Sequence, residues 1–194
     1  MSVRTGRLGL GIRALVLAAV LAACGGGGTK TVAASTWAGN VCGQILAWGQ
    51  QIQAAFTSLS SSLQGAAGSG DVTKARDELV NFLDDLVNRT DQLIGRVEGA
   101  GTPDTPKGKE AASSFRAGLE DIRRAFADGK AKAQDLSTNN NEEFQKGADE
   151  LNKKAQTALE QAGSKFKQIQ QEAPGLNQAF KDAPACQTLN QASG

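Results

Sequence analysis

The stretch DVTKARDELVNFLDDLVNRTDQLIGRV, residues 71–97, decides the fold class of this 194-residue chain. Its apolar residues recur at alternating steps of three and four, which is the period of a helix that packs along one face. Asp71 stands directly before the first of them, where an aspartate side chain caps the free backbone N–H groups of a helix. The residues of this stripe are Val72, Ala75, Leu79, Phe82, Leu86 and Leu93, with Leu83, Val87 and Ile94 beside it. The stretch predicts a helix over about residues 71–98.

The same period recurs in three other segments, which predict helices over about residues 36–64, 106–136 and 140–173. Stretches rich in Gly, Pro, Ser and Asn separate the four, at residues 65–71, 99–106 and 137–141. Short connections make consecutive helices antiparallel neighbours. We therefore predict an all-α fold, an antiparallel up-down-up-down four-helix bundle.

Two of these helices carry recognisable start signals. Thr105 followed by Pro106 resembles an N-cap residue and a proline at the first helical position. Asn140, with Glu143 three residues later, has the spacing of a capping box. We expect the third and fourth helices to begin at these residues.

The beginning of the chain has the pattern of an export signal. Arg4, Arg7 and Arg13 precede the apolar run ALVLAAVLAA at 14–23, which is too short to cross a bilayer. The following LAAC, residues 21–24, is similar to the bacterial lipobox, and this resemblance implies cleavage before Cys24 and lipidation of its thiol. A plain secretory signal with a stray cysteine is the alternative.

The glycines at 25–28 suit a spacer better than a phosphate-binding loop, because Cys24 and Thr29 stand where that motif needs glycines. We thus divide the chain into a signal peptide at 1–23, a lipidated cysteine with a Gly-rich flexible spacer at 24–35, and a helical domain at 36–194. The expected location is extracytoplasmic, lipid-anchored to the outer face of the bacterial cell membrane.

Two cysteines remain in this oxidising compartment, Cys42 and Cys186. A proline at 174 ends the fourth helix, and Leu176 to Phe180 leave room for one or two further turns. In an up-down topology this short helical tail returns to the end of the bundle where the first helix begins. A disulfide between Cys42 and Cys186 is the simplest pairing, and two free buried thiols are the alternative.

Composition excludes several functions. The chain has no histidine and no tyrosine, so Ser-His-Asp or Cys-His catalysis and imidazole metal sites are excluded. Without the three arginines of the signal peptide the chain is slightly acidic and has no basic block, so nucleic acid is not an expected partner. We expect no enzymatic activity, no cofactor and no metal.

Two features could carry binding. Small residues are frequent in the predicted helix faces, where they either allow close packing, which we expect, or leave a cavity for an apolar ligand: Gly49, Gly129, Ala133, Ala148, Ala155, Ala158 and Ala162. Trp37 and Trp48 lie about three helical turns apart and near one face. They belong to the core near the disulfide or form a surface that binds a partner or wall polymer.

The whole arrangement resembles the small secreted lipoproteins of actinobacteria, whose molecular role is unknown. The resemblance rests on the lipobox, the Gly-rich spacer, WAGNVC at 37–42, the Ala- and Gln-rich body and PAC at 184–186. It implies no catalytic residue. The expected function is a non-catalytic binding or structural role at the cell envelope, toward an envelope protein, polymer or lipid; the alternative is a carrier of an apolar or lipid ligand inside the bundle.

Overall fold

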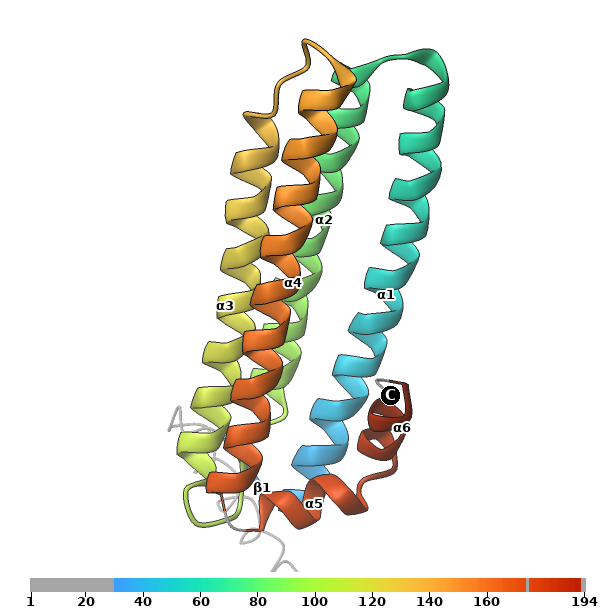
Figure 1. Cartoon of the computed structure of the whole chain (residues 1–194). Helices are drawn as coiled ribbons and strands as arrows, with labels where there is room; N and C mark the ends of the chain where they lie inside the picture. Colours follow the sequence, from blue (N-terminus) through green and yellow to red (C-terminus); the bar gives the residue numbers. More distant parts are fainter. Residues whose placement is uncertain (1–29, 174, 193–194) are drawn as a thin grey trace, which may run out of the picture.

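The computed structural model describes residues 30–173 and 175–192 (Figure 1). The predicted signal peptide, Cys24 and the glycines at 25–28 lie outside these residues. The described part is mostly helical, which confirms the all-α class. Its elements are β1 (Thr31–Val32), α1 (Ala34–Ser69), α2 (Val72–Gly99), β2 (Thr102–Pro103), α3 (Gly108–Gln134), α4 (Asn141–Glu172), α5 (Leu176–Asp182) and α6 (Pro184–Ala192).

The four long helices α1 to α4 lie side by side, and α5 and α6 lie beside the lower part of α1 (Figure 1). Close packing follows chain order, α1 on α2, α2 on α3 and α3 on α4. The last of these pairs is tight, since a Cβ added at Gly118 would lie 2.6 Å from Cε1 of Phe166. α1 and α4 are not among the closely packed pairs. One side of the helical array is therefore less closed than the others.

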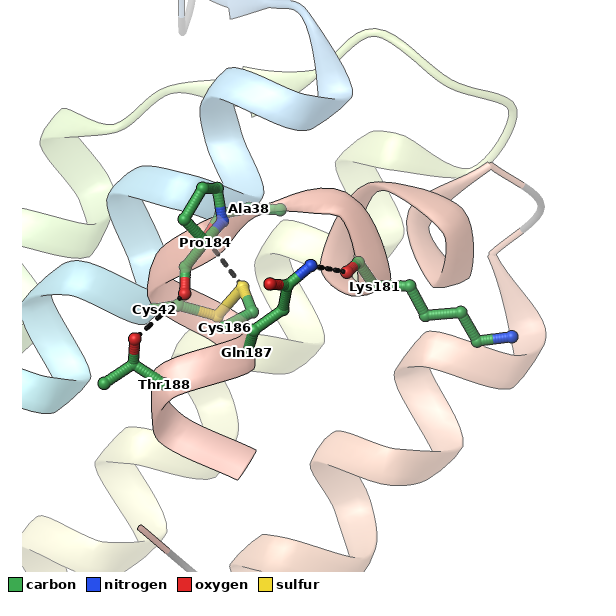
Figure 2. The surroundings of a disulfide bond; sticks show 7 residues. All are labelled: Ala38, Cys42, Lys181, Pro184, Cys186, Gln187 and Thr188. Carbon is green, nitrogen blue, oxygen red and sulfur yellow. Dashed lines mark hydrogen bonds between the residues drawn. A yellow bond between two sulfur atoms is a disulfide. The ribbon is translucent and has the colours of Figure 1, made fainter. Parts of the chain in front are cut away.

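The predicted disulfide is confirmed. Cys42 of α1 and Cys186 of α6 are bonded, with their Cα atoms 5.0 Å apart and a sequence separation of 144 (Figure 2). Cys186 lies in the first turn of a short helix that the sequence did not predict. This helix, α6, starts at Pro184, where the missing N–H of proline costs no helical hydrogen bond. The tail is thus two short helices rather than one.

The start of the domain differs from prediction. Thr31–Val32 pairs with Thr102–Pro103 as a parallel two-stranded sheet, and α1 begins at Ala34. The backbone N–H of Thr102 donates to the carbonyl of Lys30 at 2.8 Å. Residues 30–35 accordingly belong to the folded domain and not to a flexible spacer.

The predicted start of α3 was wrong. Thr105 and Pro106 lie in the turn that follows β2, and the cap position is taken by Lys107 at φ 62°, with no side-chain cap. The pairing with β1 holds the chain extended through Pro103, and this delays the helix. Gly108 is required at its first position because a Cβ there would lie 2.0 Å from the carbonyl oxygen of Pro103.

The other start signals were correct in their positions. The Asp71 carboxylate accepts from the backbone N–H of Lys74 at 2.9 Å, and Asn140 Oδ1 accepts from that of Glu143 at 2.8 Å. The capping box is incomplete, since the Glu143 carboxylate accepts from the Ser137 hydroxyl instead. Helix α1 also runs to Ser69, five residues beyond the predicted end, and stops at Gly70 with φ 69°.

A candidate ligand-binding groove

An apolar groove of about 590 Å³ lies along the side of the array where α1 and α4 are not closely packed. All four long helices contribute to its walls. The lining residues from α1 are Trp48, Gly49, Ile52, Phe56, Leu59 and Leu63, and those from α2 are Leu79, Phe82, Leu83 and Leu86. Those from α3 include Ala125, Phe126 and Gly129, and those from α4 include Ala148, Leu151, Ala155 and Leu159. We call this cavity the upper groove; its volume falls in the range of small-molecule sites, roughly 300–1,000 Å³.

The upper groove holds the most exposed large apolar side chains of the described residues. Phe56 of α1 is 52 % exposed and Leu159 of α4 is 41 % exposed. The ring of Phe56 meets that of Phe82 edge-on, with centroids 4.9 Å apart. Both side chains border the upper groove, so exposed apolar surface lies on its α1 side and on its α4 side.

The stripe of small residues is divided between two roles. Ala133 and Ala162 are buried, at 0 % and 2 % exposure, so close packing describes them. Gly49, Ala148 and Ala155 line the upper groove, as does Gly129. A Cβ added at Gly49 would meet nothing within 4 Å. The expectation of close packing along the whole stripe was wrong, because this part of α1 faces open space rather than a helix.

Charged side chains border the upper groove in balanced numbers. They are Asp128 and Lys132 of α3 and Asp149 and Lys154 of α4, all of them exposed. The buried lining residues, Leu83, Leu86 and Phe126, are apolar. The groove therefore offers an apolar floor with little net charge at its rim.

A second apolar cavity, of about 530 Å³, lies nearer the disulfide, and we call it the lower cavity. Cys42 and Cys186 form part of its wall, together with residues of α5. Phe115 and Phe166 stack within it at a centroid distance of 4.4 Å. Other apolar lining residues are Ile45, Leu93, Leu119, Ile122, Phe180 and Leu189.

The structure separates the two tryptophans. Trp37 is fully buried, donates from Nε1 to the carbonyl of Gly101 at 3.0 Å, and meets Phe115 and Phe180 edge-on at 5.9 Å. It thus takes the core role and not that of a binding surface. Trp48 is partly buried and lines both the upper groove and the lower cavity. Its Nε1 is buried and has no hydrogen-bond partner in the described part of the chain.

The perturbed acidic groups lie away from both cavities. Ion pairing with Lys165 and Arg124 lowers the pKa of Asp121, with the Lys165 hydrogen bond as the larger cause. The Ser137 hydroxyl, followed by Asn140, lowers the pKa of Glu143. Neither carboxylate lines a cavity, so these shifts belong to surface ion pairs and a helix cap.

Two broader searches of residues 30–173 and 175–192 gave negative results. No group of three or more Cys, Asp and Glu residues is placed to hold a metal ion there. None of the helices in that part of the chain is both long and apolar enough to span a membrane. Comparison of the chain with protein-family models, with curated proteins and with solved structures found no match.

Proposed function

We propose that this protein is a lipid-anchored, extracytoplasmic lipoprotein that binds the apolar chain of a lipid in its upper groove, without catalysing a reaction. The observation that carries the proposal is the pair Phe56 and Leu159, which expose large apolar surface on opposite helices above an apolar floor. An apolar ligand that removes this surface from water gains a binding free energy of about 25 cal/mol per Å² of apolar area buried.

The proposal includes the finer architecture, an up-down-up-down four-helix bundle that is left open between α1 and α4. Sequential packing of α1 to α4 and the short connections between them support it. In a closed bundle the first and last helices would also pack along their length. Here the ligand takes the place of that contact.

The dimensions of the upper groove suit an acyl chain. Its lining on α1 runs from Trp48 to Leu63, which is about 22 Å at a rise of 1.5 Å per residue. A bilayer core of about 30 Å gives each leaflet chains of roughly 15 Å. Each methylene group buried contributes about 0.8 kcal/mol, so a long chain would bind with useful affinity despite few polar contacts.

The proposed lipid anchor and extracytoplasmic location are supported by LAAC at 21–24 and by the resemblance to actinobacterial lipoproteins. Wild-type protein should incorporate radiolabelled palmitate and fractionate with the membrane, and Cys24→Ser should do neither. If the wild-type protein takes up no label, the lipid anchor is contradicted. Ligand binding in the upper groove is tested independently of this result.

Ligand binding is tested with N-phenyl-1-naphthylamine, a neutral dye whose emission rises in apolar surroundings. We expect saturable binding by the mature chain carrying Cys24→Ser, together with a change in tryptophan emission. Trp48→Phe should remove the emission change, because Trp37 is fully buried and is not among the residues that line the upper groove. Absence of saturable dye binding would refute the proposed function.

A further inference from the structure

The lower cavity differs from the upper groove in the charge at its rim. Its polar lining residues are Lys167 of α4, and Asn177 and Lys181 of α5, and no carboxylate is among them. Both lysines are exposed, and neither forms an ion pair within the described residues. The upper groove, by contrast, has two acidic and two basic residues at its rim. The lower cavity therefore combines an apolar interior with a positive edge.

Two lysines of α3 and α4 are paired with carboxylates. Lys130 pairs with Asp84 at 2.6 Å, and Lys165 pairs with Asp121. Lys167, two residues after Lys165, has no such partner, and the side chain of Lys181 extends away from the disulfide (Figure 2). An anion at the rim would supply the missing countercharge for both.

We propose that the lower cavity binds an anionic amphiphile, a long acyl chain ending in a carboxylate or phosphate, whose chain lies against Phe115 and Phe166 and whose anion lies between Lys167 and Lys181. Asn177 adds amide donors at the same rim. This inference rests on the proposed function, because Trp48 lines both cavities and a chain that enters the lower cavity continues toward the upper groove. The proposed ligand is therefore anionic at one end and apolar along its length.

The position of the lower cavity favours a membrane as the source of that ligand. Cys42, in its wall, lies about two turns along α1 from Ala34, and the chain enters the fold at Lys30. If Cys24 carries the lipid anchor, Lys30 is six residues further along the chain, which is at most about 20 Å of extended backbone. The cationic rim would then stand near the head groups of the leaflet that holds the anchor.

The test measures displacement of the bound dye by two ligands that have the same chain, palmitate and hexadecanol. The variant is Lys167→Gln with Lys181→Gln, and the matched control is Lys74→Gln with Lys153→Gln, exposed lysines outside both cavities that change the net charge equally. All proteins are the mature chain with Cys24→Ser, and equal melting temperatures establish that folding is intact.

We expect wild type and control to prefer palmitate to hexadecanol, and the Lys167 and Lys181 variant to lose about tenfold in palmitate affinity with hexadecanol unchanged. Added salt should weaken palmitate binding by wild type and control, and should have little effect on the Lys167 and Lys181 variant. If the dye binds but palmitate and hexadecanol displace it with equal affinity, the inference is overturned and the proposed function stands. If the dye does not bind, both are overturned.

A second arm identifies the source of the anion. Vesicles of phosphatidylglycerol and of phosphatidylcholine are offered to the dye-loaded protein in place of the free ligands. Displacement by phosphatidylglycerol vesicles that depends on Lys167 and Lys181 supports a phospholipid head group, and displacement by palmitate alone supports a free fatty acid. Displacement by both vesicles with no dependence on the lysines overturns the anionic specificity.

Discussion

Two alanines of α4, seven residues apart, should respond in opposite ways to enlargement. Ala155 lines the upper groove, whereas Ala162 is 2 % exposed within the main core. Replacement by leucine adds the same three carbons at both positions and keeps helix propensity nearly constant. The pair therefore measures whether this side of the array is open in solution.

The expected magnitudes follow from these surroundings. Three buried methyl or methylene groups contribute at most about 2.4 kcal/mol, and a groove open on one side yields roughly 1 kcal/mol of that. Ala155→Leu should therefore raise the melting temperature by about 2 to 4 °C for a domain of this size. Ala162→Leu should overpack the core at a cost of about 1 to 3 kcal/mol, which lowers the melting temperature by about 2 to 12 °C.

The assay combines thermal unfolding by circular dichroism with titration of N-phenyl-1-naphthylamine. Ala155→Leu should bind the dye at least about tenfold more weakly than wild type, since the leucine occupies its space. Ala162→Leu should keep its affinity at temperatures where it is folded. A destabilised Ala155→Leu that still binds the dye as wild type does would show that α4 packs closely at this position and would refute the groove.

The remaining predictions concern stability and ionisation. Gly49→Ala should raise the free energy of unfolding by about 1 kcal/mol because its Cβ meets open space, while Gly108→Ala should lower it by about 1 to 3 kcal/mol because its Cβ meets the carbonyl of Pro103; equal effects in urea unfolding would contradict this. The oxidised protein should have no alkylatable thiol at Cys42 or Cys186, and Cys42→Ser should cost about 2 to 5 kcal/mol by releasing a long loop of the unfolded chain; a melting temperature equal to that of wild type would argue against the disulfide as a stabilising link. Ser137→Ala should raise the pKa of Glu143 toward its ordinary range in an NMR titration, because the hydroxyl that favours the carboxylate is gone. Since a lowered pKa gives stability that is present at neutral pH and lost as acid protonates the group, wild type should lose more stability on acidification than Ser137→Ala does, and parallel stability curves would be inconsistent with this linkage.

Local signals predicted the helical part of this fold well. Asp71 and Asn140 cap α2 and α4 through their own side chains, which accept from backbone N–H groups three residues later. The signal for where each of these helices begins therefore lies within four residues of sequence. The start of α3 was mispredicted because it depends on β1, about 70 residues earlier in the chain. Thr105 and Pro106 have the right chemistry for a helix start, but the pairing of Pro103 with Val32 determines the backbone there.

The groove could not be predicted by the same means. Ala155 and Ala162 are the same residue type on the same helix, seven residues apart, and the sequence pattern gives both the same face. Ala162 packs into the main core whereas Ala155 lines the upper groove, and the residues that surround each come from other helices. One available signal was Gly49, which lies about two turns before Phe56 on the apolar face of α1 and leaves space there.

The short C-terminal helices explain how α1 and α4 are joined where they do not pack directly. Helix α5 contacts both α4 and α1, α6 packs on α1, and the disulfide links α6 to α1 covalently. The tail thus occupies, at one end of the array, the position that a direct contact between α1 and α4 would take in a closed bundle. Phe180 of α5 packs edge-on against Trp37, whose indole also holds Gly101 next to β2. Because the core, strand β1 and the disulfide together fix this end, the separation between α1 and α4 is built into the fold. Phe56 and Leu159, further along the same two helices, keep exposed apolar surface.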